Sequence, residues 1–208
     1  MSVLSYEIRL CQSCGLRYPL TVDHAFGERC PLCLGTTERV LARQIAPGTA
    51  ARATESGIQL EALLDNVRSA WNVGSVFRTA DGLGVGKLYL CGITPTPDNE
   101  AVRKTSLGSE ESVAWEYSRN ALELAKRLKV EGVKLIALEQ DPRAAPITQL
   151  VISDSRFSIL VLGNEITGVD PDLLDICDQI VQIPMRGQKR SFNVEVAFAI
   201  AAYSLAKG

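Results

Sequence analysis

The stretch Ser158-Ile-Leu-Val-Leu-Gly-Asn-Glu-Ile-Thr-Gly168 decides the predicted fold of this chain. Its residues 159–162 form a short apolar run that Gly163 ends, which is typical of a strand buried on both faces of a sheet. A second, more weakly alternating strand is predicted at 180–183, and Pro184 ends it. The loops that follow these two strands therefore lie at carboxyl ends, where ligands bind in open α/β sheets.

Helices and strands alternate along the chain after residue 57. Helical spacing and capping residues predict helices over 72–83, 100–107, 120–130 and from Pro171, and apolar runs predict strands over 87–91 and 134–138. Asn72, Asn120 and Asp170 are the expected N-caps, and Gly108 is expected to end the second helix. The segment 58–67 is either a helix or an extended lead-in. The alternation predicts a parallel sheet with helices on both faces.

The composition of the chain is that of an ordinary folded protein. Of its 208 residues, 46% are apolar and 22% are charged. The net charge of −2 and the pI of about 5.6 argue against a surface that binds nucleic acid everywhere, so such binding must use local basic patches. No apolar run approaches the roughly 20 residues that span a bilayer, and no signal-peptide pattern is visible. We therefore expect a cytoplasmic protein without a membrane partner.

Two CxxC pairs, Cys11-Gln-Ser-Cys14 and Cys30-Pro-Leu-Cys33, are separated by fifteen residues. This spacing predicts a structural zinc site in which each pair forms a tight turn and directs two thiolates at one tetrahedral ion. Two disulfides or inert thiols are the alternatives, and a reducing compartment disfavours the disulfides. His24 could replace one cysteine, although an exposed loop histidine is the simpler interpretation. Cys91 and Cys177 are isolated, so we expect them to be buried structural thiols.

These patterns divide the chain into a zinc ribbon at 1–45, a linker at 46–57 and an α/β domain at 58–208. Pro47-Gly48 and small polar residues mark the linker. A ribbon of this size cannot build its own core and should fold with its metal. Ribbons of this kind bind nucleic acid or another protein, or serve only as structural modules. In this ribbon, phosphate contact is only weakly indicated by Arg9, Arg17 and Arg29, because nearby acidic residues offset their charge.

Several common enzyme classes lack their motifs here. There is no GxGxxG after a strand, no GxxxxGK[ST] and no GxSxG. The only histidine, His24, lies in the ribbon, so a Ser-His-Asp mechanism in the larger domain would lack its base. What remains is a group of polar residues near the strand-end loops, suited to a small ligand: Asn72, Arg78, Glu165, Ser191 and Asn193.

Several ordered motifs resemble those of the SpoU/TrmH family of RNA 2′-O-ribose methyltransferases. They are Asn72-x-Gly-x-x-x-Arg78, Leu162-Gly-Asn-Glu-x-x-Gly168, Ile183-Pro-Met and Ser191-Phe-Asn-Val, with Lys104-Thr-Ser-Leu-Gly-Ser-Glu110 resembling a segment between the first two. The resemblance runs from about residue 64 to residue 203. Each motif falls at its expected place in the alternation of strands and helices.

The resemblance implies the SPOUT fold, a parallel α/β domain whose C-terminal segment threads a trefoil knot, an arrangement that connection rules alone would reject. It also implies a homodimer in which the partner helps to build the site. S-adenosylmethionine would bind in the knot, and its apolar walls and backbone contacts would come from Leu138, Gly163, Ile183, Met185 and Phe192. The family usually has leucine where this chain has Phe192.

The implied reaction is in-line displacement of a sulfonium methyl group by a ribose 2′-hydroxyl in tRNA or rRNA. In the family the arginine at the position of Arg78 is proposed to activate the hydroxyl. Free guanidinium has a pKa of about 12.5–13.8, so two roles stay open: a base assisted by an adjacent phosphate or carboxylate, or a cation that positions phosphate and stabilises the developing alkoxide. Asn72, Ser191 and Asn193 would orient the ribose and the arginine, and Asn193 would also cap the last helix. Glu165 would orient the loop or a basic partner.

Two basic patches are the predicted RNA contacts. They consist of Arg186, Lys189 and Arg190 beside the cofactor loop, and of Arg103 and Lys104 as a weaker second patch. Two alternatives to an RNA-selecting enzyme stay open: a non-catalytic RNA-binding protein that keeps the fold, and an enzyme whose ribbon docks a protein.

Overall fold

The structure is a computed structural model that describes residues 4–21, 28–45, 59–150 and 157–205. Contacts within the chain form two compact units, residues 1–53 and 54–208, and each is described by itself. His24 and the predicted linker at 46–57 lie outside the described residues.

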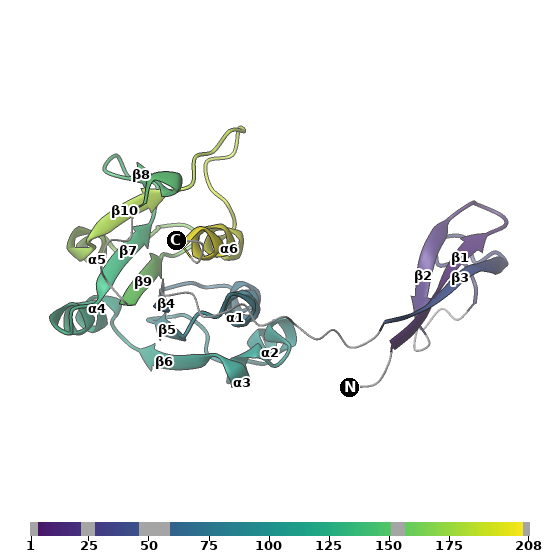
Figure 1. Cartoon of the computed structure of the whole chain (residues 1–208), viewed down its shortest axis with the longest axis horizontal. Helices are drawn as coiled ribbons and strands as arrows, with labels where there is room; N and C mark the ends of the chain where they lie inside the picture. The colour runs from purple at the N-terminus through teal and green to yellow at the C-terminus, as the bar shows by residue number, and fades with distance from the viewer. Residues whose placement is uncertain (1–3, 22–27, 46–58, 151–156, 206–208) are drawn as a thin grey trace. The chain divides into compact units, whose positions relative to one another are not determined.

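The N-terminal unit is a three-stranded antiparallel sheet in the order β2-β1-β3 (Figure 1). Its strands are β1 (Leu4–Cys11), β2 (Arg17–Thr21) and β3 (Thr37–Ile45). Tyr18 and Leu20 alternate with exposed residues along β2 and turn inward. Few large apolar side chains are buried among the described residues of this unit, so hydrophobic burial alone gives it little stability.

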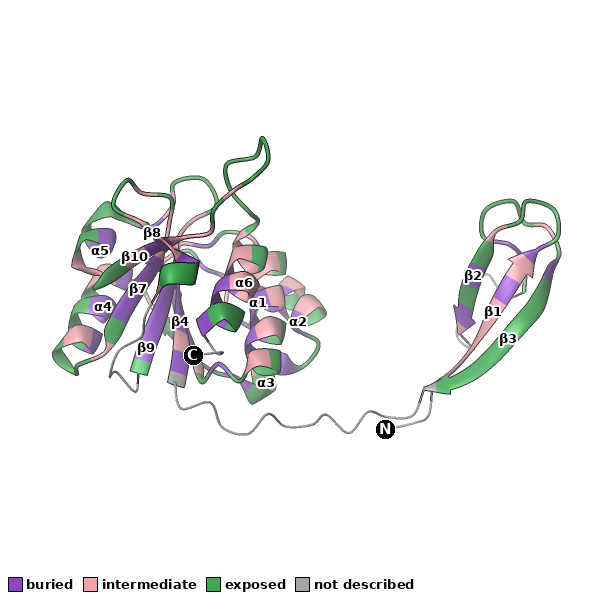
Figure 2. Cartoon of the chain, turned by 45° about the horizontal axis from the view of Figure 1, so that its top comes forward, coloured by how far each residue is buried: buried purple, intermediate pink, exposed green. Residues whose placement is uncertain are grey.

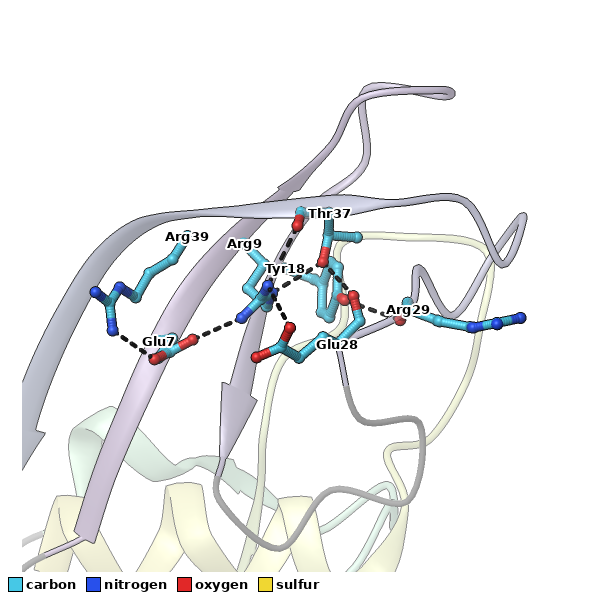
Figure 3. A network of polar contacts seen from close by, with 7 residues as sticks. All are labelled: Glu7, Arg9, Tyr18, Glu28, Arg29, Thr37 and Arg39. Atoms are coloured by element: carbon cyan, nitrogen blue, oxygen red, sulfur yellow. Dashed lines mark hydrogen bonds and ion pairs between the residues drawn. The ribbon is translucent and has the colours of Figure 1, made fainter.

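A buried arginine joins the strands of this small sheet (Figure 3). The Arg9 side chain is only 7% exposed. Its Nε donates to Thr37 Oγ1 at 2.8 Å, its Nη1 donates to Glu7 Oε2 at 2.8 Å, and its Nη2 donates to the Thr37 carbonyl at 3.2 Å. Nη2 also lies 3.5 Å from the Glu28 carboxylate. Arg9 is therefore occupied within the ribbon, and the weak expectation that it contacts phosphate is not supported.

The larger unit contains a seven-stranded sheet in the order β6-β5-β4-β9-β7-β10-β8, and every paired neighbour is parallel. Its strands are β4 (Gln59–Asp65), β5 (Lys87–Cys91), β6 (Ala114–Ser118), β7 (Lys134–Leu138), β8 (Ala145–Pro146), β9 (Phe157–Leu162) and β10 (Gln179–Gln182). The predicted parallel α/β fold is confirmed. The segment left open at 58–67 forms β4, next to β9 near the middle of the sheet.

Helices cover both faces of this sheet (Figure 1). They are α1 (Ala70–Leu83), α2 (Glu100–Ser106), α3 (Ser109–Ser112), α4 (Ala121–Val130), α5 (Pro171–Ile176) and α6 (Val194–Leu205), with a 3-10 helix η1 (Ile147–Gln149). Helices α4 and α5 lie on one face, and α1, α2 and α6 lie on the other. None of the described helices is long and apolar enough to cross a membrane.

Strand β9 contributes to both cores, as its apolar run predicts. Leu160 and Leu162 pack into the core under α1 and α6, whereas Ile159 and Val161 pack into the core under α4. Successive side chains of a strand point to opposite faces, so a continuous apolar run suits a strand covered on both sides. Figure 2 shows these central strands as buried. The sheet thus gives the loops at its carboxyl edge a rigid base.

Two local predictions are wrong. The N-cap of α1 is Ser69, whose side chain accepts from the Asn72 N–H at 3.3 Å, and Asn72 lies within the first turn. Helix α2 ends at Ser106 with Leu107 as its C-cap in the left-handed conformation at φ 54°, and Gly108 is instead the N-cap of α3. The caps at Asn120 and Asp170 are confirmed. The trefoil knot stays a prediction.

The isolated thiols are structural. Cys91 is fully buried at the end of β5, and Cys177 is partly buried with its Sγ donating to the Leu173 carbonyl at 3.3 Å. Burial raises the pKa of both thiols to about 12, so neither is a nucleophile at neutral pH.

Helices α1 and α2 meet at Gly74, which gives the first prediction. A methyl group at Gly74 would overlap Thr105 Oγ1 and the Val102 carbonyl, whereas one at Gly82 of the same helix would meet nothing within 4 Å. We expect Gly74→Ala to lower the free energy of unfolding by about 1–3 kcal/mol through overpacking. Gly82→Ala should leave it unchanged or raise it by up to about 1 kcal/mol.

Urea unfolding followed by tryptophan fluorescence measures this difference, because both tryptophans, Trp71 and Trp115, lie in the larger unit. Equal stability of the two variants would contradict the close approach of α1 and α2.

Candidate active site

A cavity of about 350 Å³, here called the first cavity, lies at the carboxyl ends of β7, β9 and β10. All the residues that the resemblance assigns to the cofactor line it: Leu138, Gly163, Ile183, Met185 and Phe192. Three of the predicted catalytic residues line it too: Glu165, Ser191 and Asn193. Segments far apart in the sequence thus meet at the edge where α/β sheets bind ligands. The roles of these residues stay predictions.

The loop after β9 is a tight turn that requires glycine at both ends. The backbone of Asn164 pairs with that of Gly168 through two hydrogen bonds of 3.0 Å. The Asn164 Oδ1 accepts from the N–H groups of Ile166 at 2.9 Å and Thr167 at 3.2 Å. A methyl group at Gly163 would overlap the Gly168 backbone, and Gly168 has a φ of 74°. These contacts give the turn a fixed backbone conformation where it lines the cavity.

Glu139 lies at the site although no sequence motif predicted it there. Its Oε2 accepts from the Val169 N–H at 3.0 Å and its Oε1 from the Gln140 N–H at 2.8 Å, so it joins the loop after β7 to the loop after β9. It also lines the first cavity, as do Gln140, Asn164 and Gln182. Glu139 directly follows a predicted strand, and this position at a carboxyl end was the signal available in the sequence.

The Glu165 carboxylate binds the amino end of α1. Its Oε2 accepts from the Arg68 N–H at 2.9 Å, and its Oε1 accepts from the Ser69 N–H at 3.0 Å and from Asn72 Nδ2 at 3.1 Å. Partial burial would raise the pKa of Glu165, but the hydrogen bonds from backbone N–H groups outweigh it and lower that pKa below its usual value. Glu165 is therefore an anion that fixes the β9 loop to α1.

Asn72, which binds Glu165, also forms a hydrogen bond with the residue before α6. Its Oδ1 accepts from Asn193 Nδ2 at 3.0 Å, and the Asn193 Oδ1 in turn accepts from the Glu195 N–H at 2.9 Å. Asn193 thus binds Asn72 and caps α6 at the same time. Three predicted catalytic residues, Glu165, Asn72 and Asn193, form one hydrogen-bonded chain that joins a loop and two helices.

Arg78 lies elsewhere. It is exposed on α1 and lines a separate cavity of about 570 Å³, here called the second cavity, together with Ser75, Thr79, Lys104, Thr105, Leu107 and Glu195. No hydrogen bond or ion pair engages its guanidinium within the described residues. Helix α6 and the residue before it contribute to both cavities, since Asn193 lines the first and Glu195 lines the second. Within one chain, Arg78 and the predicted cofactor residues therefore line different cavities.

The predicted RNA contacts differ in their surroundings. Arg186, Lys189 and Arg190 are exposed on the segment between β10 and α6, which projects from the larger unit in Figure 1. Lys104 lines the second cavity and forms an ion pair with Glu100 at 2.9 Å. Arg103 instead donates to the Pro97 carbonyl at 2.6 Å, within its own segment.

In the N-terminal unit, the four cysteines converge. Their sulfur atoms all lie within 4.8 Å of one another, with 3.5 Å between Cys11 and Cys33 and 3.6 Å between Cys14 and Cys30. All are free thiols, so the disulfide alternative is not supported. Sulfurs about 2.3 Å from one tetrahedral ion lie just under about 4 Å apart, so this group fits zinc.

Residues 59–203 match the SpoU rRNA Methylase family. The chain belongs to this family. The match confirms the resemblance that the motifs showed, and it spans the whole sheet of the larger unit together with both cavities. The Cys11–Cys33 segment lies outside it.

Named relatives of this SpoU member act on RNA. It is 34% identical over 143 residues to the 23S rRNA (guanosine(2553)-2′-O)-methyltransferase RlmP of Bacillus subtilis, covering 69% of this chain and 56% of that protein. It is 30% identical over 141 residues to the tRNA (guanosine(18)-2′-O)-methyltransferase of Aquifex aeolicus, covering 67% of this chain and 64% of that protein. The chain thus spans less than two thirds of the length of these relatives.

Solved structures share the fold of the larger unit. The A. aeolicus TrmH/SpoU tRNA modifying enzyme superposes with a TM-score of 0.64 at 28% identity, over 72% of this chain and 74% of that one. An AdoMet-bound rRNA methyltransferase from Sinorhizobium meliloti gives a TM-score of 0.67 at 23% identity, over 72% of this chain and 56% of that one.

The contacts of Glu165 generate the second prediction. Because its folded-state pKa is lowered, the ionised carboxylate stabilises the fold at neutral pH, and this contribution is lost as pH falls through the lowered pKa. Glu165→Gln should therefore lower the free energy of unfolding by about 1 kcal/mol at pH 7, as the loss of a helix cap does. The difference from wild type should shrink below about pH 4.3, where free glutamate protonates.

Urea unfolding at several pH values tests this, with Glu131→Gln at the exposed end of α4 as the matched control. A difference that stays constant down to about pH 3 would contradict the anionic role of Glu165.

Proposed function

We propose that this chain transfers a methyl group from S-adenosylmethionine to a ribose 2′-hydroxyl of tRNA or rRNA. The observation that carries the proposal is the contrast in charge between the two cavities. The charged residues that line the first cavity are Glu139 and Glu165, both acids, whereas the second cavity is lined by Arg78 and Lys104 with Glu195. An acidic pocket suits the cationic sulfonium of the cofactor, and a basic one suits RNA phosphate.

The first cavity also fits the cofactor in size and surface. Its volume falls in the range of small-molecule sites, about 300–1,000 Å³. Leu138, Ile183, Met185 and Phe192 provide apolar walls, and the turn from Gly163 to Gly168 provides backbone groups for polar edges. S-adenosylmethionine, when bound, would supply the reactive methyl group. The chain itself would bind and orient the cofactor and exclude water.

The hydrogen-bonded chain of Glu165, Asn72 and Asn193 would act by positioning. It holds the β9 loop, α1 and α6 in fixed relation, so the ribose and the methyl group would meet in one geometry. Alignment of this kind can supply much of the rate enhancement. Ser191, exposed at the edge of the first cavity, would contact the ribose. Arg78 and Lys104 would bind the adjacent phosphate, with the exposed Arg186, Lys189 and Arg190 extending the RNA surface.

The separation of the two cavities supports a homodimer. Methyl transfer needs cofactor and RNA contacts at one point, yet Arg78 and the cofactor residues line different cavities of one chain. In the proposed dimer, the second cavity of one copy completes the first cavity of the other. Light scattering of the purified protein would measure its molar mass directly.

The third prediction tests the activity. We expect wild-type protein to transfer label from S-adenosylmethionine to unmodified total RNA, with the label on ribose after nuclease digestion. Arg78→Ala should lower the rate at least about 100-fold, because a preorganised cation near developing negative charge contributes on that scale. Arg127→Ala, exposed on α4 on the opposite face of the sheet, should keep the wild-type rate.

Size fractionation of the labelled RNA separates tRNA from rRNA as the substrate. Cofactor binding by calorimetry without label on any RNA would contradict the enzyme and favour a non-catalytic RNA-binding protein.

We further propose that Cys11, Cys14, Cys30 and Cys33 hold a structural zinc ion in a reducing, cytoplasmic environment. The convergence of four free thiols and the small core of the unit support this. The fourth prediction is that reduced protein carries about one zinc per chain and loses it in Cys14→Ser. Cys177→Ser is the control and should keep the metal. Elemental analysis that finds no metal in wild type would contradict the zinc site.

A further inference from the structure

Glu195 directly follows the Ser191-Phe-Asn-Val motif and lines the second cavity with Arg78 and Lys104. Its Oε1 accepts from Thr79 Oγ1 at 3.0 Å, and Thr79 is the neighbour of Arg78 on α1. Its backbone N–H donates to Asn193 Oδ1 at 2.9 Å. Thr79 of α1 thus holds the Glu195 side chain, and Asn193 at the start of α6 holds the Glu195 backbone. Within the described residues, Oε2 of Glu195 forms no hydrogen bond or ion pair.

The lining of the second cavity matches the chemistry of a ribonucleotide. A ribonucleotide presents a phosphate anion and, close to it, a 2′-hydroxyl that can donate a hydrogen bond. Arg78 and Lys104 are cations that bind phosphate, and the only carboxylate among the lining residues, Glu195, accepts from a hydroxyl. The combination distinguishes RNA from a simple polyanion, because a cavity built for phosphate alone gains nothing from a carboxylate.

A carboxylate can also serve as the general base that removes the proton of the 2′-hydroxyl. A general base must be unprotonated at working pH. Free guanidinium has a pKa of about 12.5–13.8 and free glutamate of about 4.3, so at neutral pH a carboxylate is ready to accept a proton and a guanidinium is not. The cation and the base would then be separate groups on one wall.

We propose that Glu195 accepts the proton of the 2′-hydroxyl during methyl transfer, while Arg78 and Lys104 hold the adjacent phosphate. This inference rests on the proposed function, including the homodimer. The hydroxyl oxygen forms a bond to the methyl carbon as the carbon–sulfur bond breaks. Sulfur keeps that electron pair and becomes a neutral thioether, and the hydroxyl proton passes to the Glu195 carboxylate and then to water.

The pH dependence of the methyl-transfer rate distinguishes Glu195 from Arg78 as the general base. The charged groups that face Glu195 are Arg78 from α1 and Lys104 from α2, the latter paired with Glu100. With Glu195 as base, the rate falls as pH drops through the range of a carboxylate and is flat above it. With Arg78 as base, the rate keeps rising to alkaline pH.

The experiment, which is the fifth prediction, measures single-turnover methyl transfer to unmodified total RNA from about pH 3.5 to about pH 10. Glu195→Gln keeps an acceptor for Thr79 and should lose about 10²–10⁴-fold in rate together with the acid limb of the profile. Glu195→Asp should recover part of the rate. Cofactor affinity by calorimetry should not change. Glu123→Gln, exposed on α4, is the matched control.

A rate for Glu195→Gln within about threefold of wild type would overturn the proposal, as would a wild-type profile that rises throughout the alkaline range.

A binding measurement distinguishes this inference from the proposed function. A fluorescein-labelled RNA hairpin is compared with the same hairpin carrying 2′-deoxyribose in its loop. Wild type should prefer ribose by about tenfold through the hydrogen bond to the carboxylate, and Glu195→Gln should weaken that preference. An equal ribose preference in wild type and variant overturns the role of Glu195 even if RNA is methylated. Absence of methylation with a Glu195-dependent preference overturns the proposed activity but keeps the ribose contact.

Discussion

The placement of the β9 loop against α1 depends on one interaction, the binding of the Glu165 carboxylate to the amino end of α1. An anion is favourable there because the first N–H groups of a helix lack intrahelical partners and carry partial positive charge. Glu165 accepts from the N–H of the N-cap residue Ser69, from that of Arg68 just before it, and from the Asn72 side-chain amide. Since the glycine-bounded β9 loop has little freedom of its own, fixing its carboxylate fixes the loop against the helix that carries Arg78.

The sheet makes this contact possible. Strand β9 lies between β4 and β7, and its side chains alternate between two cores, so its carboxyl end cannot shift without disturbing both. Asn72 and Asn193 then extend the constraint to α6, whose first turn lies beside the first cavity. The β9 loop, α1 and α6 thus have one set of relative positions, which is what a site for aligned displacement would need.

Local patterns predicted the parts of this arrangement that depend on local physics. The doubly buried run at β9, the caps at Asn120 and Asp170, and the strand-end loops follow from periodicity and turn chemistry. Predictions failed where the role of a residue depends on a partner that is distant in the sequence. Ser69 and Asn72 are both good N-caps, and Glu165 binds Asn72 from far along the chain. Arg9 is paired because the register of β1 with β3 places Thr37 opposite Cys11, two residues along the strand, where the Arg9 side chain reaches it. Arg78 belongs to the same ordered set of motifs as the cofactor residues, but within one chain it lines a different cavity.

The division of charge between the cavities explains why such a separation is useful. A guanidinium within the first cavity would repel a sulfonium cation in a poorly solvated pocket, where like charges interact strongly. With acids at Glu139 and Glu165 in one cavity and cations at Arg78 and Lys104 in the other, each chain would bind a cationic and an anionic reactant at sites of opposite sign. A second copy of the chain would bring the two sites together only when the complex is assembled. The cation near the methyl donor would then be neutralised by the RNA phosphate that it binds, so that the reaction centre becomes electrostatically balanced when its substrate arrives.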